Sequence, residues 1–555
     1  MKDQMETKIP LEEAYFAKPT WLKTWSGIPL KEVYTPEDVK DLDYSRDLAN
    51  PGQFPYTRGP YTDMYRGRLW SVREVSGHSS PRITNEWLKY LVAQGSNAIN
   101  VICDVASIYA GVDSDHPVAE GTVGLMGTPI CSLRDMETMV DGLPLDELSC
   151  TLTMGFAQHL MYLAVCEKRG VPWSKVRGTF FTDYLTVYLV RAAGDNEAKG
   201  TGSGMRLSRD GMLWYSKNVP MAVPICIGAE GIRESGATAA QEIAFAFCSA
   251  RAYLKEVLNK GADIEEMAPR IAFTFRCGID IFEEAAKFRA ARRVWAKMLS
   301  EDYGAKSKYA LRLRVHVVTK GSDLTEQQAE LNIIRIAYQA LAAILGGVQS
   351  MHTCSFDEPI CLPTEESVRI ALRTQQILAY ETGAITVADP LGGSYYVESL
   401  TNTLEEEIWK IIREWDKKDF VAAVEHDTLM DSLLGQAYKF QRQIENGERI
   451  MVGVNKFTIP EESEQKRVIF EVDEKAVAEH IASVKELRKT RDNKKVKQAL
   501  DNLRRAFDNR EENFFPAAYE AVKANCTNME LMGVLRMSYG LPYDRWGLWE
   551  YPFKD

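Results

Sequence analysis

The chain has 555 residues, with 67 basic and 78 acidic side chains and a formal net charge of −11. This length allows roughly two to four average domains, or one large domain with extensions. An acidic chain is a poor general binder of nucleic acids or anionic membranes, because both require a basic face. No apolar run is long enough to span a bilayer, and the charged N-terminus lacks the apolar core of a signal peptide.

The ten cysteines are scattered, with no CxxC pair, and most lie in apolar segments such as 99–105. This pattern predicts buried thiols in the reducing cytoplasm and disfavours a zinc site. Neither GxGxxG nor GxxxxGK[ST] occurs, which disfavours dinucleotide-binding and P-loop folds.

Residues 1–45 are mixed in charge and interrupted by prolines, and we expect an extended N-terminal arm there that docks on another subunit. The next stretch, 56–77, gathers four arginines that are opposed only by Asp63 and Glu74. In an acidic chain such a concentration of positive charge predicts a local pocket for a small anion. The four arginines are Arg58, Arg66, Arg68 and Arg73.

From about residue 95, short runs of β-branched and aromatic residues recur, each followed by a stretch with helical periodicity. The predicted strands are 99–105, 148–154, 176–183, 223–231, 270–278, 310–318, 347–355 and 384–390. Eight such units predict an α/β fold, a (β/α)8 TIM barrel, over residues 46–458. A doubly wound sheet is the competing architecture, and the number of units favours the barrel.

Within 325–345, Thr325 and Gln328 have the spacing of a capping box. Apolar residues then recur at helical intervals, at Leu331, Ile334, Tyr338, Leu341 and Leu345. We therefore expect a helix to begin near Thr325.

Active sites of barrels lie at the C-terminal ends of the strands. That rule selects Asp183, Glu230, His316 and His352 as pocket candidates. The alternative, that each is a hydrogen-bonded polar group at a strand end, stays open.

Residues 459–555 form a highly charged region with a thin apolar stripe at Val496, Leu500, Leu503 and Phe507. We expect a C-terminal helical region that either docks on a partner or remains an exposed tail.

Several stretches together resemble the methylmalonyl-CoA mutase family, the adenosylcobalamin-dependent acyl-CoA mutases. They are YTRGPYTDMYRGRLWSVRE, VDSDHPVAEGTVG, LPLDELSCTLTM, IRESGATAAQEIAFAF, KFRAARRVWAKM, QSMHTCSFDEPICLPT, ADPLGGSYYVESLT and VGVNKF. Their order along residues 50–457 is that of the family. The resemblance implies a (β/α)8 barrel with coenzyme A threaded along its axis, in agreement with the strand count.

The resemblance also carries site residues onto this sequence. The implied acyl-CoA contacts are Tyr61, Met64, Arg68, Ser71, Arg73, Thr179, Arg191, Arg314, His316 and Gln349. The implied contacts to cobalamin or its adenosyl group are Arg191, Glu234 and Glu381. We expect Arg68 and Arg73 to face phosphates or polar groups of coenzyme A.

Four positions depart from the family pattern around the acyl group. Val75 stands where methylmalonyl-CoA mutases have a tyrosine, Phe181 where they have a glutamine, and Glu230 and Gly231 where they have Tyr-His. Arg191, which pairs the free carboxylate of methylmalonyl-CoA, is retained. These changes predict a reshaped, more apolar pocket for a dicarboxylyl-CoA bulkier than methylmalonyl-CoA. Pairing with Arg233 is one option for the carboxylate of Glu230. Methylmalonyl-CoA mutase proper, or a non-catalytic CoA-ester-binding scaffold, are the alternatives.

The DxHxxG motif of the cobalamin-binding module is absent from the sequence. The chain therefore resembles a separately encoded large subunit, expected to form a hetero-oligomer with a small cobalamin-binding subunit and to be served by a G-protein chaperone. The implied reaction is a radical 1,2-shift of the carbon skeleton. It requires no nucleophile and no metal ligand from this chain, since the cofactor carries the difficult step.

Overall fold

The computed structural model describes residues 22–180, 183–191, 203–426, 428–460 and 468–553. The strands are β1 (Ser71–Val72), β2 (Val75–Ser76), β3 (Ala98–Ile102), β4 (Ser149–Thr153), β5 (Arg177–Phe180), β6 (Ala222–Val223), β7 (Ile225–Gly228), β8 (Ile271–Cys277), β9 (Val315–Thr319) and β10 (Ser350–His352). Their pairings are all parallel and form two five-stranded sheets, in the orders β1-β10-β9-β8-β7 and β2-β3-β4-β5-β6.

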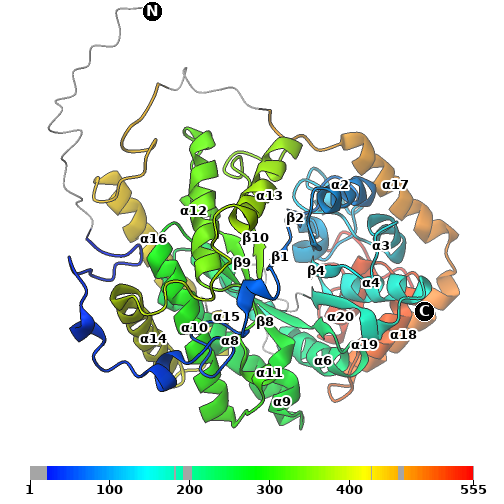
Figure 1. Ribbon diagram of the computed structural model, residues 1–555. Coiled ribbons are helices and arrows are strands. Elements are labelled where there is room, and N and C mark those ends of the chain that lie inside the picture. Colours follow the sequence, from blue (N-terminus) through cyan, green and yellow to red (C-terminus); the bar gives the residue numbers. More distant parts are fainter. Residues whose placement is uncertain (1–21, 181–182, 192–202, 427, 461–467, 554–555) are drawn as a thin grey trace, which may run out of the picture.

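The two sheets close into one barrel, because two barrel strands each contribute one segment to either sheet. Only Arg73 and Glu74 separate β1 from β2, and only Pro224 separates β6 from β7. Each pair is thus one barrel strand that is interrupted where it passes between the sheets. In the β6–β7 strand the interruption falls at Pro224, which has no N–H to donate. The expected eight-stranded (β/α)8 barrel is confirmed within the described residues (Figure 1).

Helices surround the strands (Figure 1). They are α2 (Pro81–Ala93), α3 (Leu133–Met139), α4 (Phe156–Lys168), α5 (Tyr184–Arg191), α6 (Ser203–Asn218), α7 (Ala229–Glu234), α8 (Ala239–Asn259), α9 (Ile264–Met267), α10 (Ile281–Tyr303), α11 (Lys308–Leu311), α12 (Asn332–Leu345), α13 (Glu365–Tyr380), α14 (Tyr395–Trp415), α15 (Phe420–Glu425), α16 (Thr428–Glu445), α17 (Glu474–Thr490), α18 (Asn493–Asp508), α19 (Phe515–Lys523) and α20 (Asn528–Ser538). No helix in these described stretches is both long and apolar enough to cross a lipid bilayer.

One predicted strand is wrong, and one barrel strand was not predicted. Residues 384–390 form turns rather than a strand, and Asp389 there accepts hydrogen bonds from Arg58 and Arg289. The first barrel strand instead lies in 71–76, inside the arginine-rich stretch. It escaped prediction because it is short and broken by two charged residues, so it shows no run of β-branched or aromatic side chains.

The predicted capping box at Thr325 is also wrong. Helix α12 begins at Asn332, and Gln328 has a left-handed backbone with φ 47°. The side chain of Asn332 instead accepts a hydrogen bond from the Thr325 backbone N–H at 3.1 Å. The predicted apolar stripe does end with the helix at Leu345, but it is not the buried face, because Ile334 and Tyr338 are 54% and 48% exposed.

The hydrophobic core lies between the strands and the helices. In β3, Ile99 and Val101 are buried in the cluster that also holds Met136 of α3 and Leu160 of α4. Because side chains alternate along a strand, Ala98, Asn100 and Ile102 point to the opposite side, into the barrel. The apolar core is therefore outside the barrel wall, and the interior is left to other side chains.

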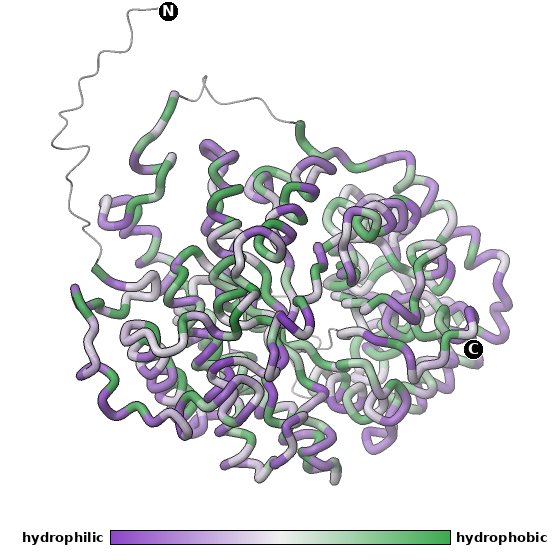
Figure 2. Tube along the Cα trace, viewed as in Figure 1, coloured by the Kyte–Doolittle hydropathy of each residue, from purple (hydrophilic) through white to green (hydrophobic). Residues whose placement is uncertain are grey.

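The C-terminal helices pack on the chain itself. Val496, Leu500, Leu503 and Phe507 are fully buried, in one cluster with residues of α4, α19 and α20. Figures 1 and 2 show α17 and α18 along one flank of the barrel, with hydrophilic and hydrophobic residues mixed along both helices. The apolar stripe of α18 thus has an intramolecular partner.

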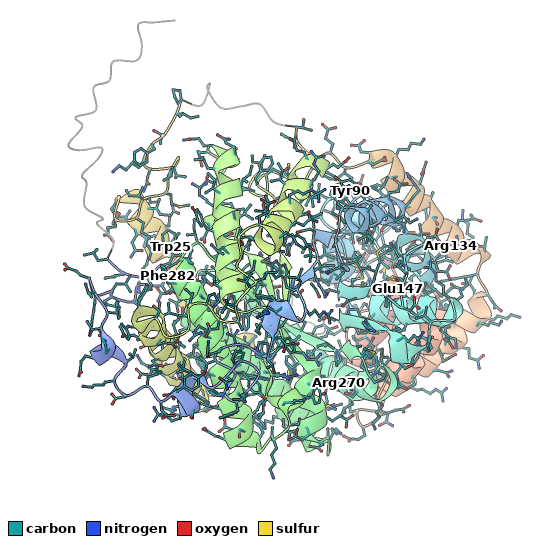
Figure 3. All side chains as sticks on the ribbon, in the orientation of Figure 1. Trp25, Tyr90, Arg134, Glu147, Arg270 and Phe282 are labelled. Atoms are coloured by element: carbon teal, nitrogen blue, oxygen red, sulfur yellow. The ribbon has the colours of Figure 1, made fainter. Side chains whose placement is uncertain are left out.

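The described part of the N-terminal arm crosses the outer helices. The Thr24 hydroxyl donates to Glu283 at 2.6 Å, and the Trp25 backbone N–H donates to Asp280 at 2.9 Å. Figure 3 shows Trp25 and Phe282 on the same flank of the molecule. The arm is therefore anchored at the start of α10 from residue 24 onward.

Candidate active site

A cavity of about 930 Å³ occupies the barrel axis. Its walls are small or hydroxylated side chains from successive strands, namely Ser149, Thr151, Gly178, Thr179, Cys226, Ala272, Thr274 and Ser350. Ordinary (β/α)8 barrels fill this space with layers of branched apolar residues. Replacing those layers by serine, threonine, alanine and glycine keeps the axis open for a ligand.

The cavity opens at the N-terminal ends of the strands. Its rim includes Arg177 at the start of β5, Met221 before β6, and Arg312 and Arg314 before β9. Arg270, labelled in Figure 3, directly precedes β8 and lies at the same end of the barrel. A ligand therefore enters at the end opposite to the usual active-site face and extends toward it.

Five arginines line this cavity: Arg68, Arg73, Arg177, Arg312 and Arg314. None of them forms an ion pair with an aspartate or glutamate of the described residues. Arg68, Arg177 and Arg314 are exposed at the rim, whereas Arg73 lies deep in the barrel with 7% of its surface accessible. The gradient from exposed to buried cations suits a ligand with several anionic groups at one end and a polar group further in.

Arg73 is the deepest of these cations. Its guanidinium donates to the hydroxyls of Thr151 and, at 3.3 Å, of Ser149, while its Nε is buried without a partner. Burial lowers the pKa of Arg73 to about 10, and the positive charge of Arg68 acts in the same direction. A buried cation without an anion is costly, so Arg73 is a candidate contact for an anionic or polar ligand.

His316 faces the same cavity from β9. Its Nδ1 lies 2.9 Å from the Ser350 hydroxyl, and its Nε2 is buried without a partner among the described residues. Burial, followed by the charges of Arg73, His352 and Arg276, holds the pKa of His316 well below its usual value. The neutral ring can therefore offer one hydrogen bond to a polar group in the cavity.

Most of the predicted substrate contacts converge here. The lining includes Tyr61, Met64, Arg68, Ser71, Arg73, Thr179, Arg314, His316 and Gln349. Arg312 stacks its guanidinium over Tyr61 at 5.2 Å from the ring centroid. Sequence reasoning missed Arg177 and Arg312, although both lie in or beside predicted strands, where alternation could have placed them inward.

The predicted acyl-pocket residues lie beyond the lining of this cavity. Val75 begins β2, and Glu230 and Gly231 form the first turn of α7, directly after β7. Phe181 lies outside the described residues, and Arg191 ends α5 with a side chain that is not described. Val75, Glu230 and Gly231 thus lie toward the C-terminal ends of the strands, past Arg73 and His316.

Two of the strand-end candidates make structural hydrogen bonds. Asp183 accepts from the Tyr253 hydroxyl at 2.6 Å and from the Gly228 N–H at 2.9 Å, while burial raises its pKa to about 6. His352 pairs with the buried Glu74. Of the four candidates, only His316 lines the axial cavity.

Arg233 is not placed to neutralise Glu230. It pairs with Glu284 at 3.1 Å and approaches Glu242 at 3.9 Å. The charge of Glu230 bears on Arg276. Burial lowers the pKa of Arg276, but nearby acidic groups, chiefly Glu234 and to a lesser extent Glu230, raise it above its usual value. The partners of Arg233 are therefore Glu284 and Glu242, and not the expected Glu230.

Carboxylates gather at the C-terminal rim of the barrel. Glu234 lies 2.8 Å from Arg276 and accepts from the backbone N–H groups of Gly321 and Ser322 at 2.9 and 3.1 Å. Burial opposes ionisation, but Arg276 and Lys320 together hold the pKa of Glu234 below its usual value. Glu358, which the sequence analysis did not select, is exposed at the same rim.

Glu381 lies elsewhere. It is exposed directly after α13, which contacts the end of α2 through Arg373 and Gln94. Helices of a barrel run back from the C-terminal to the N-terminal ends of the strands. Glu381 is therefore at the end of the barrel opposite to Glu234.

An eight-stranded barrel with an open, arginine-rich axis and carboxylates on its far rim defines a protein that holds a long anionic ligand lengthwise. The family model of methylmalonyl-CoA mutase matches residues 23–541. The chain belongs to the methylmalonyl-CoA mutase family.

Individual relatives cover almost the whole chain. It is 36% identical over 521 residues to the 2-hydroxyisobutanoyl-CoA mutase large subunit of Aquincola tertiaricarbonis, covering 93% of this chain and 92% of the relative. It is 38% identical over 522 residues to methylmalonyl-CoA mutase of Rhizobium meliloti (strain 1021), covering 93% and 72%. The mitochondrial enzyme of Mus musculus is 34% identical over 522 residues, covering 93% and 68%. The chain is thus a catalytic subunit of a cobalamin-dependent acyl-CoA mutase, an isomerase.

Proposed function

We propose that this chain is the large subunit of an adenosylcobalamin-dependent mutase that rearranges a branched dicarboxylyl-CoA bulkier than methylmalonyl-CoA. The observation that carries the proposal is the open barrel axis with Arg73 buried in it and paired to no carboxylate of the described residues. A CoA ester supplies phosphates at one end, a narrow pantetheine chain, and a polar thioester at the other end.

The residues of this chain would bind and orient the ester. The exposed rim arginines suit the phosphates, since guanidinium groups bind phosphate through two parallel hydrogen bonds. The small wall residues leave room for the pantetheine chain, and neutral His316 offers its ring nitrogen near the inner end. Threading the ester through the barrel excludes water from the reacting end.

The C-terminal rim fits an adenosyl group. Glu234 has 23% of its side chain exposed and Glu358 is exposed, so both can accept hydrogen bonds from ribose hydroxyls. When bound, adenosylcobalamin supplies the radical that starts the rearrangement. Glu381, at the other end of the barrel, has no support for such a role, whereas Arg191 stays a predicted contact.

The size of the acyl group follows from the positions that lost bulk. Val75 and Gly231 replace a tyrosine and a histidine of the family pattern, and both lie at the C-terminal ends of their strands. With Arg191 retained, the enlarged site is suited to a second carboxylate and a longer branch. Methylmalonyl-CoA turnover by the same site is the second candidate, supported by the similarity to methylmalonyl-CoA mutases.

A small cobalamin-binding subunit is the proposed partner. This chain covers 92% of a relative that is named a large subunit, which supports a smaller companion. A G-protein chaperone stays a prediction from the resemblance, and a cytoplasmic location stays a prediction from the cysteine pattern.

The test is a reconstituted complex of this chain, its small subunit and adenosylcobalamin, assayed with a series of CoA esters. The series pairs malonyl- and succinyl-type esters of increasing branch length with monocarboxylyl esters of equal size. We expect the highest kcat/KM for a dicarboxylyl ester larger than methylmalonyl-CoA. Efficient isomerisation of methylmalonyl-CoA with rejection of larger esters would contradict the substrate assignment, and binding without turnover of any ester would favour the scaffold alternative.

A further inference from the structure

Asn100 is a polar side chain on the inner wall of the barrel that the function described so far does not use. It lies in β3, between Ile99 and Val101, whose side chains are buried in the outer core. Its neighbours in register are Val75 of β2 and Thr151 of β4. Since paired residues of adjacent strands point to the same side of a sheet, Val75, Asn100 and Thr151 all face the barrel interior.

The carboxamide oxygen of Asn100 is buried and unsatisfied. Only 4% of the residue is exposed, and its Oδ1 is buried with no hydrogen-bond partner in the described part of the chain. Its neighbours in register do not supply one: Val75 is apolar, and the Thr151 hydroxyl, which accepts from Arg73, makes no hydrogen bond to this oxygen. Buried amide groups almost always have partners, so an orphaned one on a ligand-facing wall points to a contact made by the ligand.

The position of Asn100 indicates which part of the ligand it would meet. Arg73 and Thr151 line the inner end of the axial cavity, and Asn100 pairs in register with Val75, the next inward-facing residue after Arg73. If a CoA ester enters from the N-terminal ends, its phosphates and pantetheine chain pass the rim arginines first. The acyl group then reaches Val75 and Asn100.

Resting on the proposed function, we propose that Asn100 is a specificity-determining residue that hydrogen-bonds an oxygen substituent, a hydroxyl or a carboxylate, on the acyl group. A carboxamide offers two donor hydrogens and one acceptor, so it can serve either substituent after a half-turn about Cβ–Cγ. It is neutral and therefore does not repel a carboxylate, as an aspartate would. A hydrocarbon acyl group would leave the amide unpaired.

The experiment compares the wild-type holoenzyme with Asn100→Leu, which keeps the size of the side chain and removes its polar atoms. Three CoA esters of matched branching are used: one with a hydrocarbon acyl group, one with an added hydroxyl, and one with an added carboxylate. Affinity is measured with each ester, and kcat/KM with those that turn over. We expect Asn100→Leu to weaken one oxygen-bearing ester by about 10- to 100-fold and to leave the hydrocarbon ester unchanged or improved. The affected ester identifies the substituent.

Asn85→Leu is the matched control. Asn85 is 6% exposed, and its Nδ2 donates to the carbonyl groups of Met139 and Asp141 at 2.8 Å each. This variant should lower the melting temperature without changing preference among the esters, whereas Asn100→Leu should not lower it. Equal losses on all three esters, or no loss on any, would overturn the proposal for Asn100. Failure of the wild-type protein to bind any CoA ester would instead overturn the proposed function.

Discussion

Replacing Arg73 by methionine tests whether this cation serves a ligand or the fold. The lowering of the Arg73 pKa to about 10 corresponds to roughly 3 kcal/mol that the folded barrel loses by keeping the guanidinium charged without an anion. Arg73 stays protonated below pH 10 in both folded and unfolded chains, so this cost persists at neutral pH. Removing the charge should therefore raise the stability of the ligand-free protein, by about 1–3 kcal/mol once the lost hydrogen bonds to Thr151 and Ser149 are subtracted.

The same variant should lose ligand affinity. A hydrogen bond to a charged group contributes about 1.5–3 kcal/mol, which is roughly a 10- to 150-fold weaker Kd for a CoA ester. Thermal unfolding and titration calorimetry measure the two effects separately. Arg293→Met is the control: Arg293 is also buried but pairs with Glu405 at 2.7 Å, so its loss should destabilise the fold, although Lys297 still pairs with Glu405 at 2.7 Å. A destabilised Arg73→Met protein with unchanged affinity for CoA esters would refute the reasoning.

Two further predictions concern the arm and the acyl group. Burial, followed by the charge of Asp280, raises the pKa of Glu283 to about 7, above its value in an unfolded chain. The folded protein then binds more protons in the window between the two pKa values, so Glu283 costs stability progressively as pH rises from about 4.5 to 7, by up to roughly 3 kcal/mol. Glu283→Gln should flatten the wild-type difference in melting temperature between pH 5 and pH 7.5, and an unchanged difference would contradict the assignment. Arg191→Gln should weaken dicarboxylyl-CoA substrates far more than monocarboxylyl ones in the kcat/KM assay, whereas equal loss would exclude a carboxylate-pairing role.

The fold was predictable from the sequence in its main lines. Strands β4 and β8 lie within the predicted segments 148–154 and 270–278, because their outward-facing residues are apolar and buried, Cys150 and Leu152 in β4 and Phe273 and Phe275 in β8. The first strand was not predictable in this way, because it faces the ligand through Arg73 and is divided between two sheets. The false strand at 384–390 is apolar for another reason, since Ala384 and Ile385 pack on the outer core.

Sequence reasoning located some residues of the candidate site but could not identify their side-chain partners. Residues that the family resemblance assigned to the substrate, such as Arg73, Thr179 and His316, line the axial cavity. Sequence reasoning could not assign side-chain partners, so it joined Glu230 to Arg233 when the buried acids Glu242 and Glu284 hold that arginine. It also missed Asn100, because an unsatisfied amide is visible only once the surrounding side chains are in place.

The most direct test is an experimental structure of the reconstituted complex with a non-reactive CoA ester. The account predicts the pantetheine chain along the barrel axis, with the phosphates among Arg68, Arg177, Arg312 and Arg314 and the thioester near Arg73 and His316. An ester bound outside the barrel, with the axis unoccupied by ligand, would contradict it.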